Sequence, residues 1–315
     1  MLRRILARLA VACATLFAVS ALVFLGTEAL PGDAATATLG REATPELLAQ
    51  YRAQLGLNKP LLERYQSWLR GFLRGDLGKS APNGEPVWKL ISDKARNTAA
   101  LAIATLILLL PLALALGILS ALWRDRMFDH TIAITTLVLI SSPEFVVGTL
   151  IAIALGVWLN ILPPLSLIDA NQPLTSQLQA LVLPVLTLLA ISVAQMTRMV
   201  RAILLDVLRS DFVQVATLKG ASKWRILAHH ALPNAAGPVL QVIAFTVGWL
   251  VGGIVIVENV FQFPGLGVAV TNAVLGGDLP TVEAVTMLMT AVYLGATLVA
   301  DIGAILIDPR LRRRT

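Results

Sequence analysis

We first consider the chemistry of four carboxylates chosen from those that stand within or beside long apolar segments. They are Glu28, Glu144, Glu258 and Asp301. An ionisable side chain is costly inside a membrane, so it faces a watery cavity or pairs with another group, and it marks a functional site by default. Glu144 directly follows Pro143, and a proline kink in a long helix often faces a water-filled space. Glu144 is therefore our candidate for a cavity-lining group.

The other intramembrane acids have structural explanations that compete with functional ones. Asp301 lies near the end of its segment, where it can pair with an arginine such as Arg198 or Arg201 or cap a neighbouring helix. Glu258 precedes the sequence Pro264-Gly265-Leu266-Gly267. This arrangement favours a short outer helix shaped by these residues, with a role in gating as the alternative.

Motifs for catalysis are absent from the sequence. No G-x-x-x-x-G-K-S/T loop that would cradle phosphates occurs, and neither does H-E-x-x-H nor G-x-S-x-G. His229 and His230 are adjacent, so on a helix they point about 100° apart and cannot easily chelate one metal. Met196 and Met199 are typical packing residues. We therefore expect a chain that is not an enzyme, with no metal site and no cofactor of its own.

The composition excludes a soluble enzyme. The 315 residues are 57% hydrophobic and only 14% charged, and the mean hydropathy is +0.77. A soluble domain has about 25% charged residues. The net charge of +6 is not gathered in one stripe and only 6% of residues are aromatic, so nucleic acid is not an expected partner. The single cysteine, Cys13, excludes an intrachain disulfide.

Six apolar segments are long enough to cross a hydrocarbon core about 30 Å thick. The third contains Pro143 and exceeds one straight crossing, so we expect it to be a tilted or bent helix. The segments are about Leu9 to Leu30, Thr98 to Leu122, Thr131 to Leu162, Leu178 to Thr197, Pro238 to Val257 and Glu283 to Ile307. The first continues too far for a secretory signal and is expected to stay uncleaved.

Basic residues indicate the orientation of these spans. Short cytoplasmic loops retain an excess of lysine and arginine. One side of the alternation carries Arg3, Arg4, Arg8, Arg124, Arg126, Arg198, Arg201, Arg209, Lys219, Lys223, Arg225, Arg310, Arg312, Arg313 and Arg314. The opposite short loops, about 163–177 and 259–282, contain neither residue type. Both termini are therefore expected in the cytoplasm, and the long segment 31–97 outside it.

The expected outer segment contains two helices. Thr44-Pro45-Glu46 is a helix start, and a second helix begins at about Pro60. The second carries Tyr65, Trp68 and Phe72 on one broad apolar face. These aromatic side chains either pack the two helices together or rest at the membrane interface, and the alternative is a role in gating or in docking a soluble partner.

The cytoplasmic loop at 206–234 has the pattern of two short helices around a glycine. Asp211 and Gln214 have capping-box spacing, and Phe212, Val215, Ala216 and Leu218 supply an apolar face. Gly220 suits a left-handed C-terminal cap, and Ser222 can cap a second helix that ends before Pro233. The product is either a docking element for a soluble protein or an amphipathic helix resting on anionic lipid.

This loop resembles the EAA loop of ABC-importer membrane subunits, and the similarity extends over nearly the whole chain. The residues that carry it in the loop are Gln214, Ala216, Gly220, Leu232 and Pro233. Further matches resemble the dipeptide, oligopeptide and nickel permease family: Pro31-Gly32-Asp33, Leu55-Gly56-Leu57, Gly75-Asp76-Leu77-Gly78 with Ser80, Pro86-Val87, Glu258, Phe261, Pro264-Gly265-Leu266-Gly267, Asp301 and Asp308-Pro309-Arg310. Three positions depart from the family motif, namely Gln214 for the acidic residue, Val215 for alanine and His230 for isoleucine.

The resemblance implies an all-α membrane protein with six spans, the type I ABC-importer permease fold, and a small helical extracytoplasmic segment. It divides the chain into a tail with the first span at 1–30, the outer segment at 31–97, a five-helix core at 98–307 and a basic tail at 308–315. It further implies docking of an ATPase at the 206–234 loop through Asp211, Phe212, Gln214, Ala216, Gly220, Ala221, Leu232 and Pro233. The candidates for a translocation path or gate are Glu144, Glu258, Pro264, Gly265 and Asp301.

The same resemblance implies partners and a process. A second, similar permease would form a heterodimer with this chain in a bacterial inner membrane. Two cytoplasmic subunits would bind ATP and Mg, and an extracytoplasmic binding protein would deliver substrate. Alternating access would then move peptides inward. Chelated nickel, glutathione or another small solute remain alternative substrates. An ATP-independent channel or secondary transporter is the alternative of a different class, and a membrane scaffold is a third.

Overall fold

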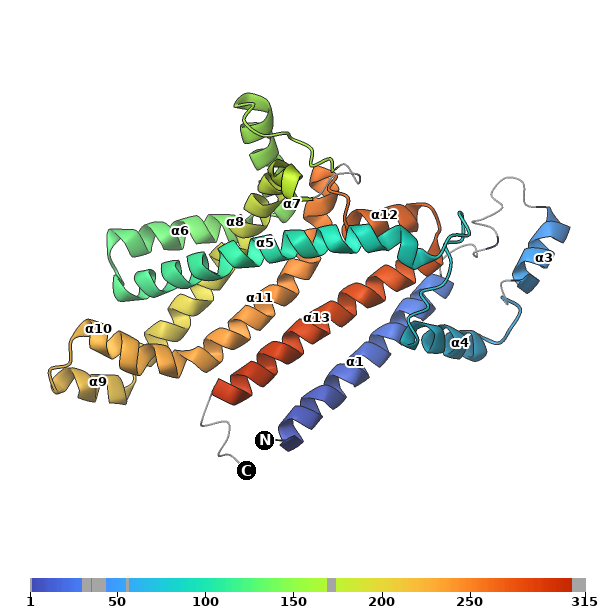
Figure 1. Cartoon of the computed structure of the whole chain (residues 1–315). Helices are drawn as coiled ribbons and strands as arrows, with labels where there is room; N and C mark the ends of the chain where they lie inside the picture. The colour runs from blue at the N-terminus through green and yellow to red at the C-terminus, as the bar shows by residue number, and fades with distance from the viewer. Residues whose placement is uncertain (1, 30–34, 36–43, 55–56, 169–173, 308–315) are drawn as a thin grey trace. The chain divides into compact units, whose positions relative to one another are not determined.

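A computed structural model describes residues 2–29, 35, 44–54, 57–168 and 174–307, and all regular structure in these ranges is helical apart from one isolated bridge between Lys79 and Pro86 (Figure 1). The all-α class expected from the sequence is confirmed. Several expected motifs lie outside the described residues, namely Pro31-Gly32-Asp33, Leu55-Gly56 and the tail with Asp308-Pro309-Arg310.

Five of the described helices are long and apolar enough to cross a membrane. They are α1 (Leu2–Glu28), α5 (Val87–Leu122), α8 (Leu178–Leu208), α11 (Leu232–Phe261) and α13 (Leu279–Ile307). The second of them, α5, begins well before the expected Thr98, because its first turns are amphipathic and bury Val87 and Ile91.

The third expected span is two helices rather than one bent helix. Helix α6 (Met127–Ser141) and α7 (Glu144–Ile151), which a π-helical segment at Ala152–Trp158 extends, meet at an angle of 106°. Ser142 has ψ 132°, outside the helical region, because the ring of the following Pro143 disfavours helical backbone at the preceding residue. If this pair counts as one crossing, the described residues contain six spans.

The chain packs as two compact units. Unit 1 comprises residues 1–9, 100–263 and 295–315, and unit 2 comprises residues 10–99 and 264–294. Unit 1 contains the 206–234 loop and the candidate Glu144, whereas the expected outer segment belongs to unit 2.

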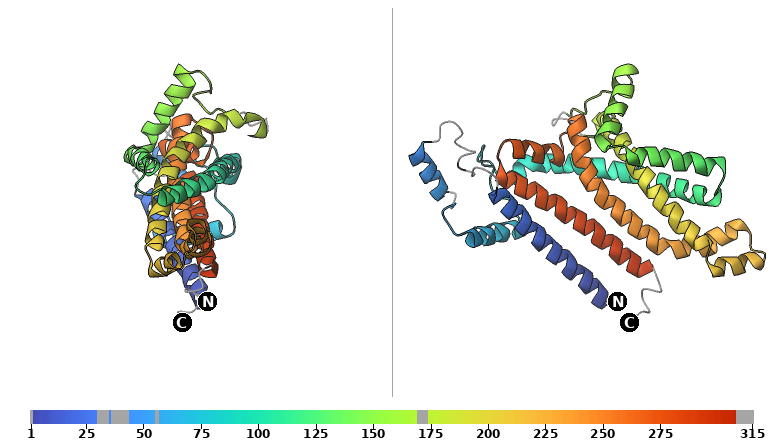
Figure 2. Two further views of the ribbon diagram at one scale, coloured as in Figure 1. Left: turned by 90° about the vertical axis from the view of Figure 1, so that its left-hand side faces the viewer. Right: turned by 180° about the vertical axis from the view of Figure 1, so that it is seen from behind.

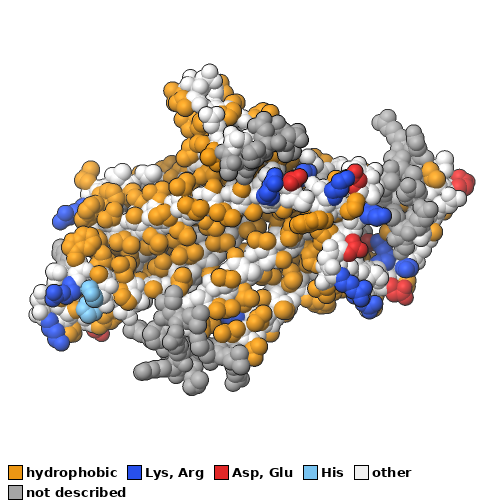
Figure 3. Space-filling model, viewed as in Figure 1, with side chains coloured by type: hydrophobic (Ala, Val, Ile, Leu, Met, Phe, Trp, Pro, Cys, Tyr) orange, Lys and Arg blue, Asp and Glu red, His pale blue; other side chains and the backbone are white. Residues whose placement is uncertain are grey.

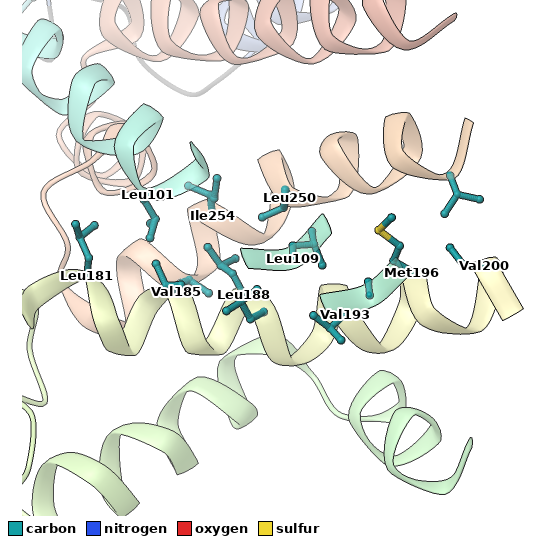
Figure 4. Packing of buried hydrophobic residues seen from close by; sticks show 14 of the residues in the cluster. Leu101, Leu109, Leu181, Val185, Leu188, Val193, Met196, Val200, Leu250 and Ile254 are labelled. Atoms are coloured by element: carbon teal, nitrogen blue, oxygen red, sulfur yellow. The ribbon is translucent and has the colours of Figure 1, made fainter. Parts of the chain in front are cut away.

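Helix α8 is the central element of unit 1. It packs against α6, α7 and α11, and its side chains Leu183, Met196 and Leu204 are almost wholly buried. Figure 4 shows Leu101 and Leu109 of α5 and Leu250 and Ile254 of α11 meeting the same row of α8 side chains. One continuous hydrophobic core therefore joins three of the spans.

Small residues let α5 approach α8 closely. A Cβ atom placed on Gly117 would lie 2.8 Å from both Cβ and Cγ1 of Val200. One turn earlier, the hydroxyl of Thr197 donates to the carbonyl oxygen of Ala113 at 3.5 Å. Ala113 and Gly117 thus form a small-xxx-small pair, the pattern that allows backbones to pack closely within a membrane.

In unit 2, an aromatic cluster joins α1 to α4 (Leu61–Leu73). Phe17 and Phe24 of α1 contact Tyr65, Trp68 of α4 lies 5.7 Å from Phe24 between ring centroids, and Trp68 stacks on Phe72. Helix α3 (Pro45–Gln54) begins where Thr44 accepts a hydrogen bond from the Leu47 amide at 3.3 Å. The two expected helix starts are confirmed, but the described contacts of the aromatic face are with the first span.

Buried polar contacts fix the rest of unit 2. Helices α1 and α13 run antiparallel, and the Thr27 hydroxyl donates to the Glu283 carboxylate at 2.7 Å (Figure 2). Asp278, just before α13, accepts hydrogen bonds from the Ser80 hydroxyl at 2.6 Å and the Ala81 amide at 3.0 Å. The short helix α12 (Leu266–Leu275) packs its first residue into a second hydrophobic cluster. The turn around residue 80 is therefore held against the start of α13.

Gly117→Ala is expected to destabilise the protein, because the added methyl group meets Val200 at 2.8 Å and overpacking costs about 1–3 kcal/mol. Gly252→Ala is the matched control, since a Cβ at that α11 position meets nothing within 4 Å. Thermal unfolding in detergent should show a lower midpoint for Gly117→Ala and an unchanged or higher one for Gly252→Ala. Equal midpoints for the two variants would contradict the close α5–α8 contact.

Candidate functional site

The 206–234 loop is a small folded element of its own. Helix α9 (Asp211–Leu218) and α10 (Lys223–Ile226) pack together through Val213, Ala216 and Ile226, with Leu208 and Ala221 at the edge of this cluster. A π-helical turn, η4 (Leu227–Ala231), then leads into α11. The expected order of helix, glycine bend and helix is confirmed.

Gly220 closes α9 with a Schellman motif. Its φ of +79° lies in the left-handed region. The Ala221 amide donates to the Ala216 carbonyl oxygen at 3.1 Å, and the Gly220 amide donates to that of Thr217 at 2.9 Å. A Cβ on Gly220 would meet nothing within 4 Å, so the backbone angle, and not space, requires glycine here.

The N-terminus of α9 differs from the expected capping box. Ser210 is the N-cap residue, with φ −69° and ψ 152°, and Asp211 is the first helical residue. The Gln214 side chain donates to the Arg209 carbonyl oxygen at 3.1 Å and does not return to the N-cap amide. The expected cap at Asp211 is wrong by one residue, because Ser210 takes the extended backbone conformation of the cap. Asp211 still places negative charge in the first turn, where the helix dipole favours it.

The second loop helix does not end before Pro233. Ser222 caps its start as expected, with its hydroxyl oxygen 3.4 Å from the Arg225 amide. The helix then continues from Trp224 to Phe261, 38 residues in all. Pro233 is tolerated because it directly follows the wide π-helical turn, where the backbone already departs from α-helical hydrogen bonding and a missing N–H is least disruptive.

The loop exposes one apolar stripe while it buries another. Phe212, Val215 and Leu218 lie at every third position of α9, and they are 38%, 49% and 88% exposed. Trp224 of α10 is 70% exposed. The expected apolar face thus points outward except for Ala216, and it forms a surface typical of an interaction site. Basic and histidine side chains also lie on the surface near this loop, at the left of Figure 3.

Glu144, the expected cavity residue, starts α7 and contacts α11. The indole N–H of Trp249 donates to its Oε1 at 3.0 Å. A Cβ on Gly253 would lie 3.0 Å from each carboxylate oxygen, so this glycine makes room for the acid. Trp249 is 47% exposed and the Glu144 side chain is partly exposed. A carboxylate beside an accessible indole can receive a cationic group, through charge and through the aromatic face.

Asp301 pairs with a different arginine from the two expected. Its Oδ2 lies 3.2 Å from Nη1 of Arg8, at the start of α1. Arg201 instead makes two hydrogen bonds to Asp129 in the first turn of α6, at 2.7 and 2.6 Å. The prediction of a structural ion pair for Asp301 therefore holds, but its partner comes from the other end of the sequence.

Asp129 is a polar centre that was not expected from the sequence. It is buried and also accepts hydrogen bonds from the Ser120 hydroxyl and the Asp125 amide, so that it ties the α5–α6 turn to α8. Only its place beside the basic turn residues Arg124 and Arg126 could have indicated it. In the sequence alone, an aspartate beside a basic turn looks like an ordinary solvent-exposed loop residue.

The remaining gate candidates have structural surroundings. Glu258 is wholly buried, and its main-chain oxygen accepts the Phe263 amide at 2.9 Å where α11 ends. In unit 2, Gly265 is the N-cap residue of α12, and the Pro264 carbonyl oxygen accepts a hydrogen bond from the Asn97 side chain at 2.9 Å. These contacts support the shaping role expected for this sequence. No group of three or more His, Cys, Asp and Glu side chains suited to a metal occurs in the described part of the chain.

Comparison with known proteins agrees with this architecture. Residues 113–313 match the family model for the binding-protein-dependent transport system inner membrane component, and residues 1–102 match the model for the N-terminal part of such membrane components. The chain is 35% identical over 309 residues to a probable peptide ABC transporter permease protein of Sinorhizobium fredii, with 98% of each chain covered. It is 31% identical over 308 residues to a putative peptide transport system permease protein of Brucella abortus, again with 98% of each covered. It is 34% identical over 315 residues to a glutathione transport system permease protein of Escherichia coli, with 99% of each covered.

Proposed function

This chain belongs to the family of inner membrane components of binding-protein-dependent transport systems, and we propose that it forms the path by which an ATP-driven importer carries peptides. The observation that carries the proposal is the glycine-bent loop with an exposed apolar stripe, built directly onto the membrane helices α8 and α11. Family membership makes the chain a non-catalytic, multi-pass inner membrane permease of an ABC importer. It implies an ATPase and a substrate-binding protein as partners and no cofactor on this chain.

Peptides are the proposed substrate because two of the relatives described above are named as peptide permeases and the third as a glutathione permease. Glutathione is itself a small peptide-like solute with a free ammonium group and carboxylates. Glu144 beside Trp249 can receive such an ammonium group. A glutathione-type substrate is therefore the alternative within the same class.

The proposed docking surface for the ATPase is the loop face formed by Phe212, Val215, Leu218 and Trp224, positioned by Gly220. Burial of apolar side chains on a partner gives association energy, and the nearby Lys219 and Arg225 would attract acidic side chains at the rim of the partner's surface. An amphipathic helix resting on lipid was the alternative for this loop. The Schellman turn and the internal packing of α9 on α10 favour a preformed, rigid docking element.

The proposed mechanism is alternating access. A second, similar permease completes the path as a heterodimer, and two ATPase subunits bind on the cytoplasmic side. The distribution of arginine and lysine supports this orientation, with both termini in the cytoplasm. Closure of the ATPases on ATP then moves the loop, and α8 and α11 carry the movement into the bundle as rigid elements. The chain itself supplies no chemical step.

Gly220→Val is expected to release the ATPase from the complex, because a β-branched residue is strained at φ +79° and the turn that presents α9 would change. Gly84→Val is the matched control, since Gly84 has φ +66° and equally open surroundings but lies in unit 2. The measurement is the amount of ATPase recovered with the tagged chain from membranes in mild detergent.

Gly220→Val should lower ATPase recovery at least about tenfold, equivalent to about 1.4 kcal/mol, with normal amounts of the chain in the membrane. Gly84→Val should leave recovery unchanged. If Gly220→Val retains the ATPase and transports normally, the docking proposal is wrong. A wild-type chain that brings no ATPase, even after crosslinking, would contradict the importer function itself.

Glu144→Gln is expected to raise the KM for peptide uptake several-fold, since the amide keeps an oxygen for Trp249 but loses the charge that attracts an ammonium group. Gly253→Ala should act similarly by displacing the carboxylate, and Gly252→Ala should not. Uptake of labelled peptide into vesicles, with and without a blocked N-terminus, measures the effect. An unchanged KM in both Glu144→Gln and Gly253→Ala would remove Glu144 from the substrate path.

A further inference from the structure

A groove of about 360 Å³ lies between α6 and α8 in unit 1, apart from both candidate sites. Its walls are mostly small or apolar, and its charged groups are two arginines. The lining residues are Ile132, Ala133, Thr136, Leu137, Thr197, Arg198, Arg201 and Ala202. The polar lining residue Thr136 already has a hydrogen-bond partner within the protein, because its hydroxyl donates to the Ala133 carbonyl oxygen at 3.1 Å.

Arg198 is the group that this arrangement leaves available. Its side chain is exposed, and it makes no hydrogen bond or ion pair with any other residue that the structure describes. Arg201, one turn away on α8, is bound to both carboxylate oxygens of Asp129. Asp129 also accepts from Ser120 and from the Asp125 amide, so it has no capacity left for a second cation. The groove therefore carries a net positive charge with a free guanidinium group.

Aromatic residues place this charge near the level of lipid headgroups. Trp123 and Phe128 pack edge to face in the α5–α6 turn, with ring centroids 5.2 Å apart, directly before Asp129. Tryptophan is typical of the membrane–water interface. Arg198 precedes Arg201 by three residues, about 4.5 Å along the helix axis. The apolar segment 178–197 ends just before Arg198, after a length of about 30 Å.

The exposed surface of α6 next to the groove is mostly apolar, with Thr131 and Thr135 as its polar side chains. Ile134, Leu137 and Val138 are 65%, 54% and 60% exposed. Such a surface suits acyl chains, and the small side chains of Ala133 and Ala202 leave the space between the helices open. The groove thus combines a free guanidinium group, expected at the level of the lipid headgroups, with apolar walls.

We propose that the α6–α8 groove binds an anionic phospholipid, with the phosphate on Arg198 and an acyl chain along Ala133 and Leu137. The guanidinium group can donate two parallel hydrogen bonds to phosphate oxygens. Basic pockets between membrane helices on the cytoplasmic side recognise headgroups in this way. An anionic lipid is preferred to a zwitterionic one because Asp129, already saturated, offers nothing to a choline group.

The test uses the full chain purified with its natural partners in mild detergent. The complex is mixed with equal amounts of phosphatidylglycerol and phosphatidylcholine of identical acyl chains, and the lipids retained are counted by native mass spectrometry. Wild-type protein should retain phosphatidylglycerol about tenfold over phosphatidylcholine. Arg198→Gln should lower that retention at least about fivefold, and Arg198→Lys should lower it less, because the charge remains while the two parallel hydrogen bonds are lost.

Two further variants separate a built site from general attraction to a basic surface. Arg126→Gln removes an exposed arginine from the α5–α6 turn that does not line the groove, and it should leave retention unchanged. Ala133→Leu keeps every charge but fills the groove, and it should lower the retention of phosphatidylglycerol. Equal losses in Arg126→Gln and Arg198→Gln, or full retention in Arg198→Gln, would overturn the proposal. So would release of another membrane subunit by Arg198→Gln in place of lipid, because the arginine would then belong to a protein contact.

Discussion

Close packing around helix α8 holds the helices of unit 1 together. The hydrophobic effect does not drive helices together inside a membrane, so their association depends on close van der Waals packing and on polar pairs between helices. Gly117 lets α5 approach Val200, and Asp129 binds Arg201 in the C-terminal part of the same helix α8. The α5–α6 turn and the hydrophobic core of unit 1 are therefore both attached to the continuous helix α8. Since α8 ends at Leu208, where the 206–234 loop begins, the position of α8 sets the position of this loop.

The loop is joined to the membrane helices at both ends, but by different devices. On one side Ser210 breaks the chain between α8 and α9, and on the other the helix runs unbroken through the π-helical turn into α11. The left-handed Gly220 is the single backbone position that reverses direction between α9 and α10. A force applied to the exposed stripe would reach α11 along a helix and α8 through a short break. This construction fits a part that moves as a rigid body between two conformations.

Much of this organisation follows from the sequence, and the failures have physical causes. Apolar length identified the spans, and Gly220, Ser222, Thr44 and Pro60 marked helix ends because each acts through its own backbone or side chain. The expected helix end before Pro233 was wrong because a π-helical turn precedes this proline and lets the helix continue through it. Asp129–Arg201 and Arg8–Asp301 were not predictable, since the choice among several arginines depends on how distant helices pack. The right-angle break at Pro143 depended likewise on tertiary structure.

The most direct test of the central claim is uptake of a labelled peptide into proteoliposomes, with this chain alone and with the complete set of its partners. We predict accumulation only when the second permease, the ATPases, the binding protein and ATP are all present, because the chain has no energy source of its own. Peptide flux through the chain alone, at the same rate with and without ATP, would contradict it and would identify an autonomous channel or secondary transporter.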